Sequence, residues 1–251
     1  MIHTTDHAAI RELQLDRPPV NALSPELIVA LRKAIEEASS GGARALILSG
    51  TPGRFSAGLD IPLLLGLDKP AISEFWPAFY GLAGAITGSA IPIVAAITGY
   101  APAGGAVLAT FCDWRLMADG DYKIGLNEVQ VGLPLPPVIL HGLRRLVGPR
   151  QAERLAVAGE MLSPQEALRV GFVDEVVPLE NVVERALEYC QRLLALPPEA
   201  MMSTRRLARA DLVALFENLE AEVKRTIAVW WDPTTQAQLR ALVERLGKRT
   251  K

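Results

Sequence analysis

A long run without charged side chains constrains the fold of this chain more than any other feature. No Asp, Glu, Lys or Arg occurs between Pro77 and Cys112. A helix that spans a membrane needs about 20 continuous apolar residues. This run is interrupted instead by residues that break such a helix: Pro92, Gly99, Pro102, Gly104 and Gly105. The sequence therefore predicts that the run is the buried core of a folded domain, with no membrane partner.

The composition of the chain excludes several classes of function. Of its 251 residues, 50% are hydrophobic and 22% are charged, which is enough apolar material for a full core. Lys and Arg (26) nearly balance Asp and Glu (28), so no basic surface predicts a nucleic-acid partner. Cys112 and Cys190 cannot build a disulfide framework, and no His/Cys cluster has the spacing of a metal site. We expect no bound metal.

The first residues of the chain lead to an expectation about location. They lack the basic and apolar regions of a secretory signal, and they are too acidic for a transit peptide. The two cysteines fit a reducing compartment. From these features we expect a cytoplasmic location.

Short apolar runs alternate with helical patterns in the first part of the chain. The runs at 45–48, 93–97 and 114–118 are typical of strands that are covered on both faces, and 8–15 alternates like a half-exposed strand. Helical patterns cover residues 26–38, 76–87, 104–111, 138–147, 149–158 and 164–170. A short strand follows at 173–177, and the chain is helical from residue 179 onward, with breaks expected at Pro197-Pro198, Asp211 and Pro233. This order predicts an α/β fold with parallel strand pairing and a helical C-terminal part.

Two turns rich in small residues each follow a buried strand and precede a helix. They are Phe55–Asp60 and Gly99–Gly105. Free N–H groups at such helix starts favour negative charge, and two turns side by side could form an oxyanion hole. The alternative is that the small residues serve only helix capping and close packing. Neither turn contains the glycine pattern of a nucleotide-phosphate loop.

Glu128 is the candidate acid/base residue. It lies in a mostly uncharged segment, just before the apolar stretch 133–140. A carboxyl group in poor solvent has a raised pKa and can exchange protons near neutral pH. The alternative is a solvated or capping glutamate. His3, His7 and His141 are scattered, and no nucleophile elbow supports a serine hydrolase.

Several motifs in one order resemble those of the crotonase, or enoyl-CoA hydratase/isomerase, superfamily. The amino-acid sequences of the two turns and of residues 125–128 are similar to those of Δ3,Δ2-enoyl-CoA isomerases. The resemblance covers roughly residues 10–180. The motifs are Arg17–Leu23, Phe55–Asp60, Ile93–Gly105, Cys112-Asp113, Ile124–Gly132, Gly148, Leu162–Ala167 and Gly171–Val177.

The resemblance implies a fold and an assembly. Members of the superfamily fold as a spiral of ββα turns that binds an acyl-CoA thioester without a further cofactor. We expect this crotonase-like core in residues 1–196. Residues 197–251 then form a helical region that covers the active site and builds a homotrimer or a dimer of trimers.

The resemblance also assigns roles to individual residues. It implies that the N–H groups of Ala57 and Gly104 form the oxyanion hole and that Glu128 is the acid/base. The loop 133–137 is expected to line the acyl tunnel. Residues implied to contact the acyl-CoA are Val20, Ala22, Leu23, Ser56, Ala57, Gly58, Leu59, Asp60, Ile61, Gly104, Val107 and Leu133.

The choice among reactions rests on a missing carboxylate. Hydratases of the superfamily use two glutamates, of which one matches Glu128 and the other matches Val107. With one carboxylate left, we expect an isomerase that moves a 3-enoyl-CoA double bond to the 2-trans position by a single-glutamate proton shuttle in fatty-acid-type degradation. The alternatives are an enoyl-CoA hydratase, another crotonase-type lyase or thioesterase, and a CoA-binding module without catalysis.

Overall fold

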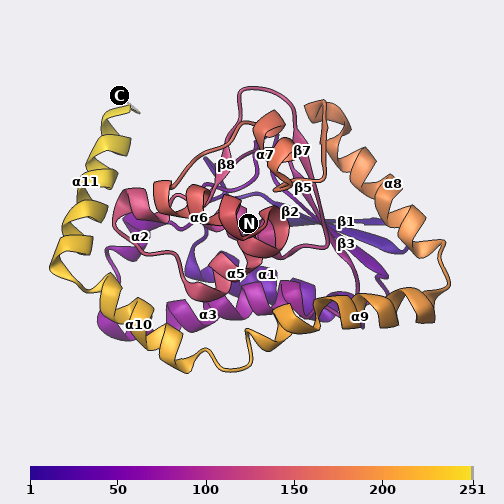
Figure 1. The fold of residues 1–251 in the computed structure, drawn as a ribbon, viewed down its shortest axis with the longest axis horizontal. Coiled ribbons are helices and arrows are strands. Elements are labelled where there is room, and N and C mark those ends of the chain that lie inside the picture. The colour runs from indigo at the N-terminus through magenta and orange to yellow at the C-terminus, as the bar shows by residue number, and fades with distance from the viewer. Residues whose placement is uncertain (250–251) are drawn as a thin grey trace.

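The apolar runs of the sequence form the centre of a parallel sheet. The computed structural model describes residues 1–249, and its large sheet has the strand order β1-β2-β3-β5-β7-β9 (Figure 1). Only the β1–β2 pair is antiparallel. The strands are β1 (Ile2–His7), β2 (Ile10–Leu15), β3 (Ala45–Ser49), β5 (Ile93–Ile97), β7 (Trp114–Ala118) and β9 (Glu175–Val177).

A second, small sheet runs alongside the first. It has the order β4-β6-β8, and its strands are β4 (Gly53–Arg54), β6 (Gly99–Pro102) and β8 (Ile124–Gly125). The chain therefore visits the large sheet, then the small sheet, then a helix, and repeats this path. This is the predicted spiral of ββα turns, and the α/β fold class is confirmed.

Helices connect the strands and cover the sheets. Those before the C-terminal part are α1 (Pro25–Ala38), α2 (Ile61–Leu64), α3 (Lys69–Thr87), α4 (Gly104–Phe111), α5 (Pro137–Val147), α6 (Pro149–Ala158), α7 (Pro164–Val170) and α8 (Val182–Leu194). Their ends follow the local sequence: the Ser24 hydroxyl accepts the N–H of Leu27 at 3.3 Å, and Ser163 forms a capping box with Glu166.

The central strands are apolar throughout because both faces of the sheet are covered. In β3, Ala45 and Ile47 pack in a cluster with Val182 and Ala186 of α8. Leu46 and Leu48 point to the opposite face and join the main core. Successive side chains of a strand alternate between faces, so a strand buried on both sides loses its polar positions.

The C-terminal helices wrap around the outside of the spiral (Figure 1). They are α9 (Pro198–Ala214), α10 (Glu220–Trp230) and α11 (Pro233–Arg249). The helical break expected at Asp211 is wrong: α9 continues to Ala214, because Asp211 lies on its exposed side and pairs with Arg145 at 2.6 Å. The chain turns instead at residues 215–219.

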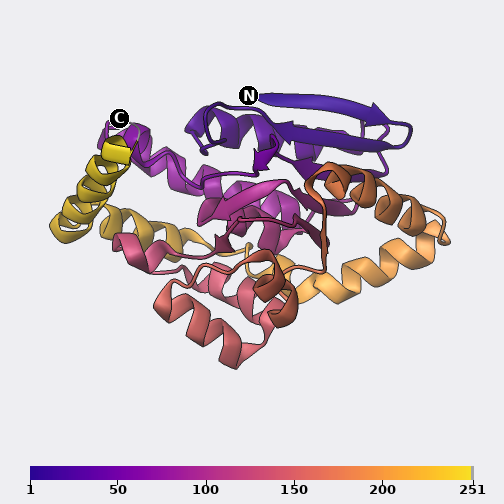
Figure 2. The same ribbon diagram turned by 90° about the horizontal axis from the view of Figure 1, so that it is seen from above.

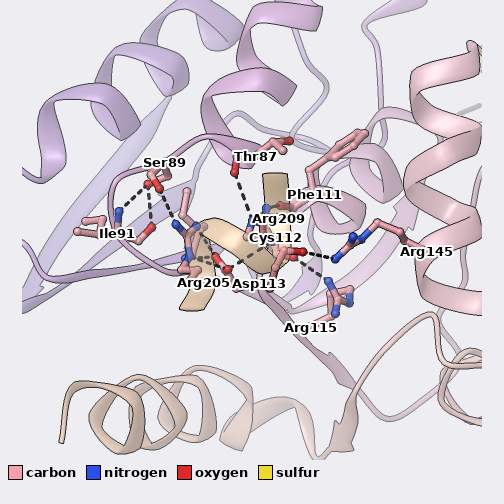
Figure 3. A network of polar contacts seen from close by, with 12 residues as sticks. Thr87, Ser89, Ile91, Phe111, Cys112, Asp113, Arg115, Arg145, Arg205 and Arg209 are labelled. Carbon is pink, nitrogen blue, oxygen red and sulfur yellow. Dashed lines mark hydrogen bonds and ion pairs between the residues drawn. The ribbon is translucent and has the colours of Figure 1, made fainter. Parts of the chain in front are cut away.

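A buried ion-pair network attaches α9 to the core (Figure 3). The carboxylate of Asp113 accepts the Nε of Arg205 at 2.8 Å and its Nη2 at 2.9 Å, and Arg209 Nη1 lies 3.3 Å away. Both arginines also donate to backbone carbonyls, Arg205 to Ser89 at 2.6 Å and Arg209 to Phe111 at 2.6 Å. These bonds hold α9 against the core.

Several short elements were not predicted from the sequence. They are β1, the three strands of the small sheet and α2. Figure 2 shows β1 and β2 as an indigo hairpin along one side of the molecule. Within residues 1–249 no helix is both long and apolar enough to cross a membrane. Cys112 and Cys190 are buried free thiols.

Candidate active site

The two small-residue turns meet back to back, and two glycines allow the contact. Gly58 has a φ of +81°, and a Cβ there would lie 2.9 Å from the nitrogen of Gly104. A Cβ at Gly104 would lie 3.1 Å from the Cα of Gly58 and 3.3 Å from the nitrogen of Leu59. Side chains at either position would separate the turns.

The meeting of these turns corrects one predicted donor. The N–H of Ala57 already donates to the carbonyl oxygen of Val20 at 3.0 Å, so Ala57 has no free donor for a ligand. The neighbouring N–H of Leu59 has no acceptor among the described residues, and neither has the N–H of Gly104. The pair of free donors is therefore Leu59 and Gly104, on opposite sides of the contact between the turns.

Backbone strain precedes the second donor. Ala103 has a φ of +45°, a region that residues with a Cβ rarely occupy. Its own N–H donates to the carbonyl of Gly125 at 2.8 Å, which ties the residue to the small sheet. Helix α4 begins at the next residue, so the strained turn leaves the first N–H of the helix without a partner.

A buried scaffold holds the first turn in place. The side chain of Asn21, 1% exposed, donates to the carbonyls of Arg54 at 3.1 Å and Phe55 at 3.2 Å. Ser56 Oγ donates to the carbonyl of Asn21 at 2.7 Å and accepts the N–H of Gly58 at 3.2 Å. The motif residues around Asn21 thus brace the turn.

A cavity of about 540 Å³ opens beside the two free donors. Of the residues predicted to contact acyl-CoA or to catalyse, those that line it are Val20, Ala57, Leu59, Ile61, Gly104, Glu128 and Leu133. The whole loop 133–137 lines it as well, as expected for an acyl tunnel. Those outside its wall are Ala22, Leu23, Ser56, Gly58, Asp60 and Val107.

Most of the residues outside the wall form the frame behind it. Leu23 is fully buried, and its N–H donates to the carbonyl of Gly58 at 2.7 Å. Asp60 caps α2 through the N–H of Leu63 at 3.1 Å and pairs with Arg17 at 2.7 Å. Contact of these residues with the adenine or pantetheine portions stays a prediction.

The expected position of Val107 is wrong. The resemblance implied that this residue contacts the acyl-CoA. It is 1% exposed, packs in the main hydrophobic core and is absent from the cavity wall. The turn before α4 orients the helix so that Gly104, and not Val107, reaches the cavity.

Glu128 reaches the cavity from a short 3-10 helix, η1 (Glu128–Val131). Its Oε2 is buried without a hydrogen-bond partner in the described part of the chain, and so is the Oδ1 of Asn127 beside it. Burial away from water raises the pKa of the Glu128 carboxyl to about 7. The group can therefore both take and return a proton near neutral pH.

Two later elements hold η1 in place. Gln130 Nε2 donates to the carbonyl of Gly159 at the end of α6, at 2.8 Å. Gly132 ends η1 with a φ of +79°, and its carbonyl accepts the hydroxyl of Thr235 on α11 at 3.4 Å. Contacts from α6 and α11 thus hold the element that carries Glu128.

The sequence analysis did not anticipate two groups of lining residues. Trp76 and Phe79 come from α3, and the α10 group comprises Glu222, Arg225, Thr226 and Val229. The α10 residues have the i, i+3, i+4, i+7 spacing of one helix face, which is the only sequence signal that they share. Within residues 1–249, no group of His, Cys, Asp and Glu side chains could hold a metal ion.

The chain is similar to known isomerases and hydratases. Its sequence is 35% identical over 245 residues to the human mitochondrial enoyl-CoA delta isomerase 1, covering 95% of this chain and 80% of that protein. It is 34% identical over 232 residues to a probable enoyl-CoA hydratase of Mycolicibacterium paratuberculosis, covering 89% and 87%. The crystal structure of human mitochondrial Δ3-Δ2-enoyl-CoA isomerase superposes with a TM-score of 0.95 at 32% identity, over 100% of this chain and 99% of that one.

These similarities contradict the cytoplasmic location expected from the sequence. The human relative is named as a mitochondrial protein. Balanced charge and unpaired cysteines fit any reducing compartment, so they could not support the cytoplasm in particular.

The family assignment rests on nearly the whole chain. The sequence model of the enoyl-CoA hydratase/isomerase family matches residues 5–246. The human isomerase structure named above superposes over the whole of this chain, so the match includes the C-terminal helices. This chain is an enzyme that belongs to the enoyl-CoA hydratase/isomerase family.

Proposed function

We propose that this enzyme isomerises 3-enoyl-CoA to 2-trans-enoyl-CoA, a step in the degradation of unsaturated fatty acyl chains. The observation that carries the proposal is the pairing of two free N–H groups, from Leu59 and Gly104, with one deeply placed carboxyl group, Glu128, in a single apolar cavity. The similarity to enzymes named as enoyl-CoA isomerases supports the same reaction.

The two free N–H groups stabilise the charge that develops on the substrate. The thioester oxygen accepts hydrogen bonds from Leu59 and Gly104, and the positive end of α4 adds to the favourable potential. Removing a proton from C2 places negative charge on this oxygen as a dienolate. One donor of this kind is worth about 2.7–4 kcal/mol in enzymes where it has been removed.

Glu128 carries the proton between the two carbons. Its carboxylate takes a proton from C2, and the C3–C4 double bond shifts as the dienolate forms. The resulting carboxylic acid gives the same proton to C4, the dienolate collapses, and the double bond remains between C2 and C3. The apolar wall around Glu128, including Leu133, limits exchange of this proton with water.

A second acid/base group next to Glu128 is what a hydratase mechanism requires. The position that matches the second hydratase glutamate is Val107, which is apolar and outside the cavity wall. The other carboxylate in the wall, Glu222, is paired with Arg225 on α10. This arrangement favours proton transfer within the substrate over the addition of water. The reaction needs no group beyond the chain and its acyl-CoA substrate.

One assay separates isomerisation from hydration. The purified enzyme is given 3-enoyl-CoA and 2-trans-enoyl-CoA of the same chain length, and product formation is followed for each. We expect turnover of the first substrate and hydration of the second at less than about one hundredth of that rate, because a missing general acid/base costs about 10²–10⁴-fold. The similarity to a probable hydratase makes hydration the second candidate. Efficient hydration, or no turnover of 3-enoyl-CoA, would contradict the proposal.

A further inference from the structure

The cavity holds a second polar group besides the one at the reaction centre. Its wall is apolar apart from Asn127 and Glu128 on one element and Glu222, Arg225 and Thr226 on α10. The proposed chemistry uses only the first group. The α10 group therefore needs an explanation of its own, because polar side chains in an apolar wall weaken the binding of an alkyl chain.

The polar side chains of α10 contact one another and the neighbouring helix α3. Glu222 is 14% exposed, and its Oε2 lies 3.2 Å from the Nη1 of Arg225, which is 61% exposed. The Thr226 hydroxyl donates to the carbonyl of Glu222 at 3.0 Å, so the buried Tyr80 hydroxyl is the donor in its 2.8 Å contact with Thr226. Both side chains of the pair line the cavity, with Glu222 the more buried of the two and Arg225 reaching solvent as well.

The wall next to this group is rigid and aromatic. Trp76 of α3 lines the cavity and packs edge to face against Trp230 of α10, with ring centroids 5.9 Å apart. Phe79 packs against Trp76 at 6.1 Å. These ring contacts hold α10, the helix that carries Glu222, against α3.

We infer that the Glu222–Arg225 pair is the polar end of the acyl site and limits the length of the acyl chain that the enzyme accepts; this inference rests on the proposed function. A growing chain gains affinity while each methylene meets the apolar wall. Once the acyl chain reaches Glu222, further methylenes displace water from a carboxylate and add no affinity.

The test measures binding along a series of saturated acyl-CoA thioesters, from butanoyl to tetradecanoyl, by calorimetry. These ligands do not isomerise, so the measurement is independent of the chemistry. For the wild type we expect affinity to rise about fourfold per methylene and then to level off. Glu222→Leu should move the levelling point to chains at least two carbons longer. Glu220→Leu is the matched control, because Glu220 lies on the same helix with its side chain 84% exposed and should leave the wild-type profile unchanged.

Glu222→Gln keeps the size of the side chain and removes its charge, so it tests the inference even if the leucine variant does not fold. It should shift the levelling point in the same direction but less. An unchanged levelling point in every folded Glu222 variant, or no levelling in the wild type, would overturn the inference. A loss of kcat on 3-enoyl-CoA of every length with unchanged affinities would also overturn it, because Glu222 would then act in the reaction. A wild type that binds the series and levels off, but turns over no 3-enoyl-CoA, would contradict the proposed function alone.

Discussion

The environment of the Glu128 carboxyl group explains how it can act on a substrate. It is buried deeply enough to raise its pKa to about 7, and its Oε2 has no partner in the described part of the chain. A structural carboxylate would be expected to have a cation or several N–H groups around it. An unpaired one in a cavity indicates a group that completes its contacts only when a substrate is present.

The pH dependence of the reaction should follow this raised pKa. Only the ionised form of Glu128 can take the proton from C2, so kcat/KM should fall about tenfold per pH unit below pH 7 and reach a plateau above about pH 8. A profile of initial rates between pH 5 and 9 checks this. A midpoint near the ordinary glutamate value, around 4–5, would contradict the buried environment.

The same shift predicts a change in stability. Because the pKa of Glu128 is higher in the folded than in the unfolded state, its contribution to stability is fully present below about pH 4.5 and is lost as the pH rises through about 7. The Glu128→Gln side chain cannot ionise, so the variant does not lose this stability as the pH rises. Relative to the wild type, the variant should gain about 3 kcal/mol in free energy of unfolding between pH 4.5 and 8, measured with urea. An equal difference between the two proteins at both pH values would contradict the shift.

The contact between the two turns should not tolerate a side chain at Gly104. In Gly104→Ala the new Cβ would meet Leu23 Cδ1 at 3.0 Å and the Leu59 nitrogen at 3.3 Å, which displaces one donor and fills the space between them. We expect kcat/KM for 3-enoyl-CoA to fall at least about 100-fold. Gly88→Ala is the control, since Gly88 has a φ of −91° and its Cβ would meet only the carbonyl of Gly84 at 3.3 Å. Full activity of a folded Gly104→Ala enzyme would exclude this oxyanion hole.

Sequence reasoning selected several residues that the structure brings together in one cavity, but it misjudged two of them. It brought Gly104, Glu128 and the turn at 55–60 together, because each is a local feature with a chemical reason. It assigned the first donor to Ala57 instead of Leu59, because it could not see that the N–H of Ala57 is used in a hydrogen bond to Val20, far away in the chain. It misjudged Val107 because tertiary packing decides which side of α4 faces the core.

At the scale of elements, α9 is attached by charge as well as by packing. Asp113, whose side chain is 13% exposed, pairs with two arginines that are 10% and 11% exposed. Its Oδ2 also accepts the N–H of Ile93 at 2.8 Å, at the start of β5. One carboxylate thus links a core strand to the helix that leads to α10 and the cavity wall.

Asp113→Asn should therefore destabilise the fold. It leaves Arg205 and Arg209 without a counter-charge in a buried setting, and we expect a loss of about 3 kcal/mol in free energy of unfolding. Asp211→Asn breaks the exposed pair between α9 and Arg145 and should cost about 0.5 kcal/mol or less. Urea unfolding of both variants checks the contrast, and equal losses would show that burial does not strengthen the Asp113 network.

Element prediction succeeded where burial is continuous. The strands at 93–97 and 114–118 and the helix at 104–111 agree with β5, β7 and α4, because apolar runs and helix breakers are strong local signals. The strands of the small sheet are two to four residues long and contain glycine and proline. They form because successive turns of the spiral place them side by side, where they hydrogen-bond to one another. Such strands have no local sequence pattern from which they could be predicted.

At the scale of the whole molecule, the C-terminal helices complete the cavity of their own chain. Most of the apolar side chains at the end of α9 and beyond it pack inward: Leu212 is 5% exposed, and Phe216 stacks edge to face on Phe111 at 5.2 Å. These apolar side chains are therefore covered within their own chain and require no partner chain. The predicted assembly rests on the family resemblance and on the apolar side chains that stay exposed, such as Leu207 at 77%.

We predict a trimer or a dimer of trimers in solution. Light scattering coupled to size exclusion at micromolar concentration measures the mass directly. A mass of three or six chains agrees with the prediction, whereas a monomer would contradict it and would leave α9 as a purely intramolecular cover.

The most direct test of the central claim is the rate at which Glu128→Gln converts 3-enoyl-CoA to 2-trans-enoyl-CoA, compared with the wild type. The variant keeps the shape of the side chain and removes its ability to take a proton. The account predicts that kcat falls by about 10³-fold or more while affinity for a saturated acyl-CoA changes less than about threefold. Activity within about threefold of the wild type would contradict the assignment of Glu128 as the group that moves the proton.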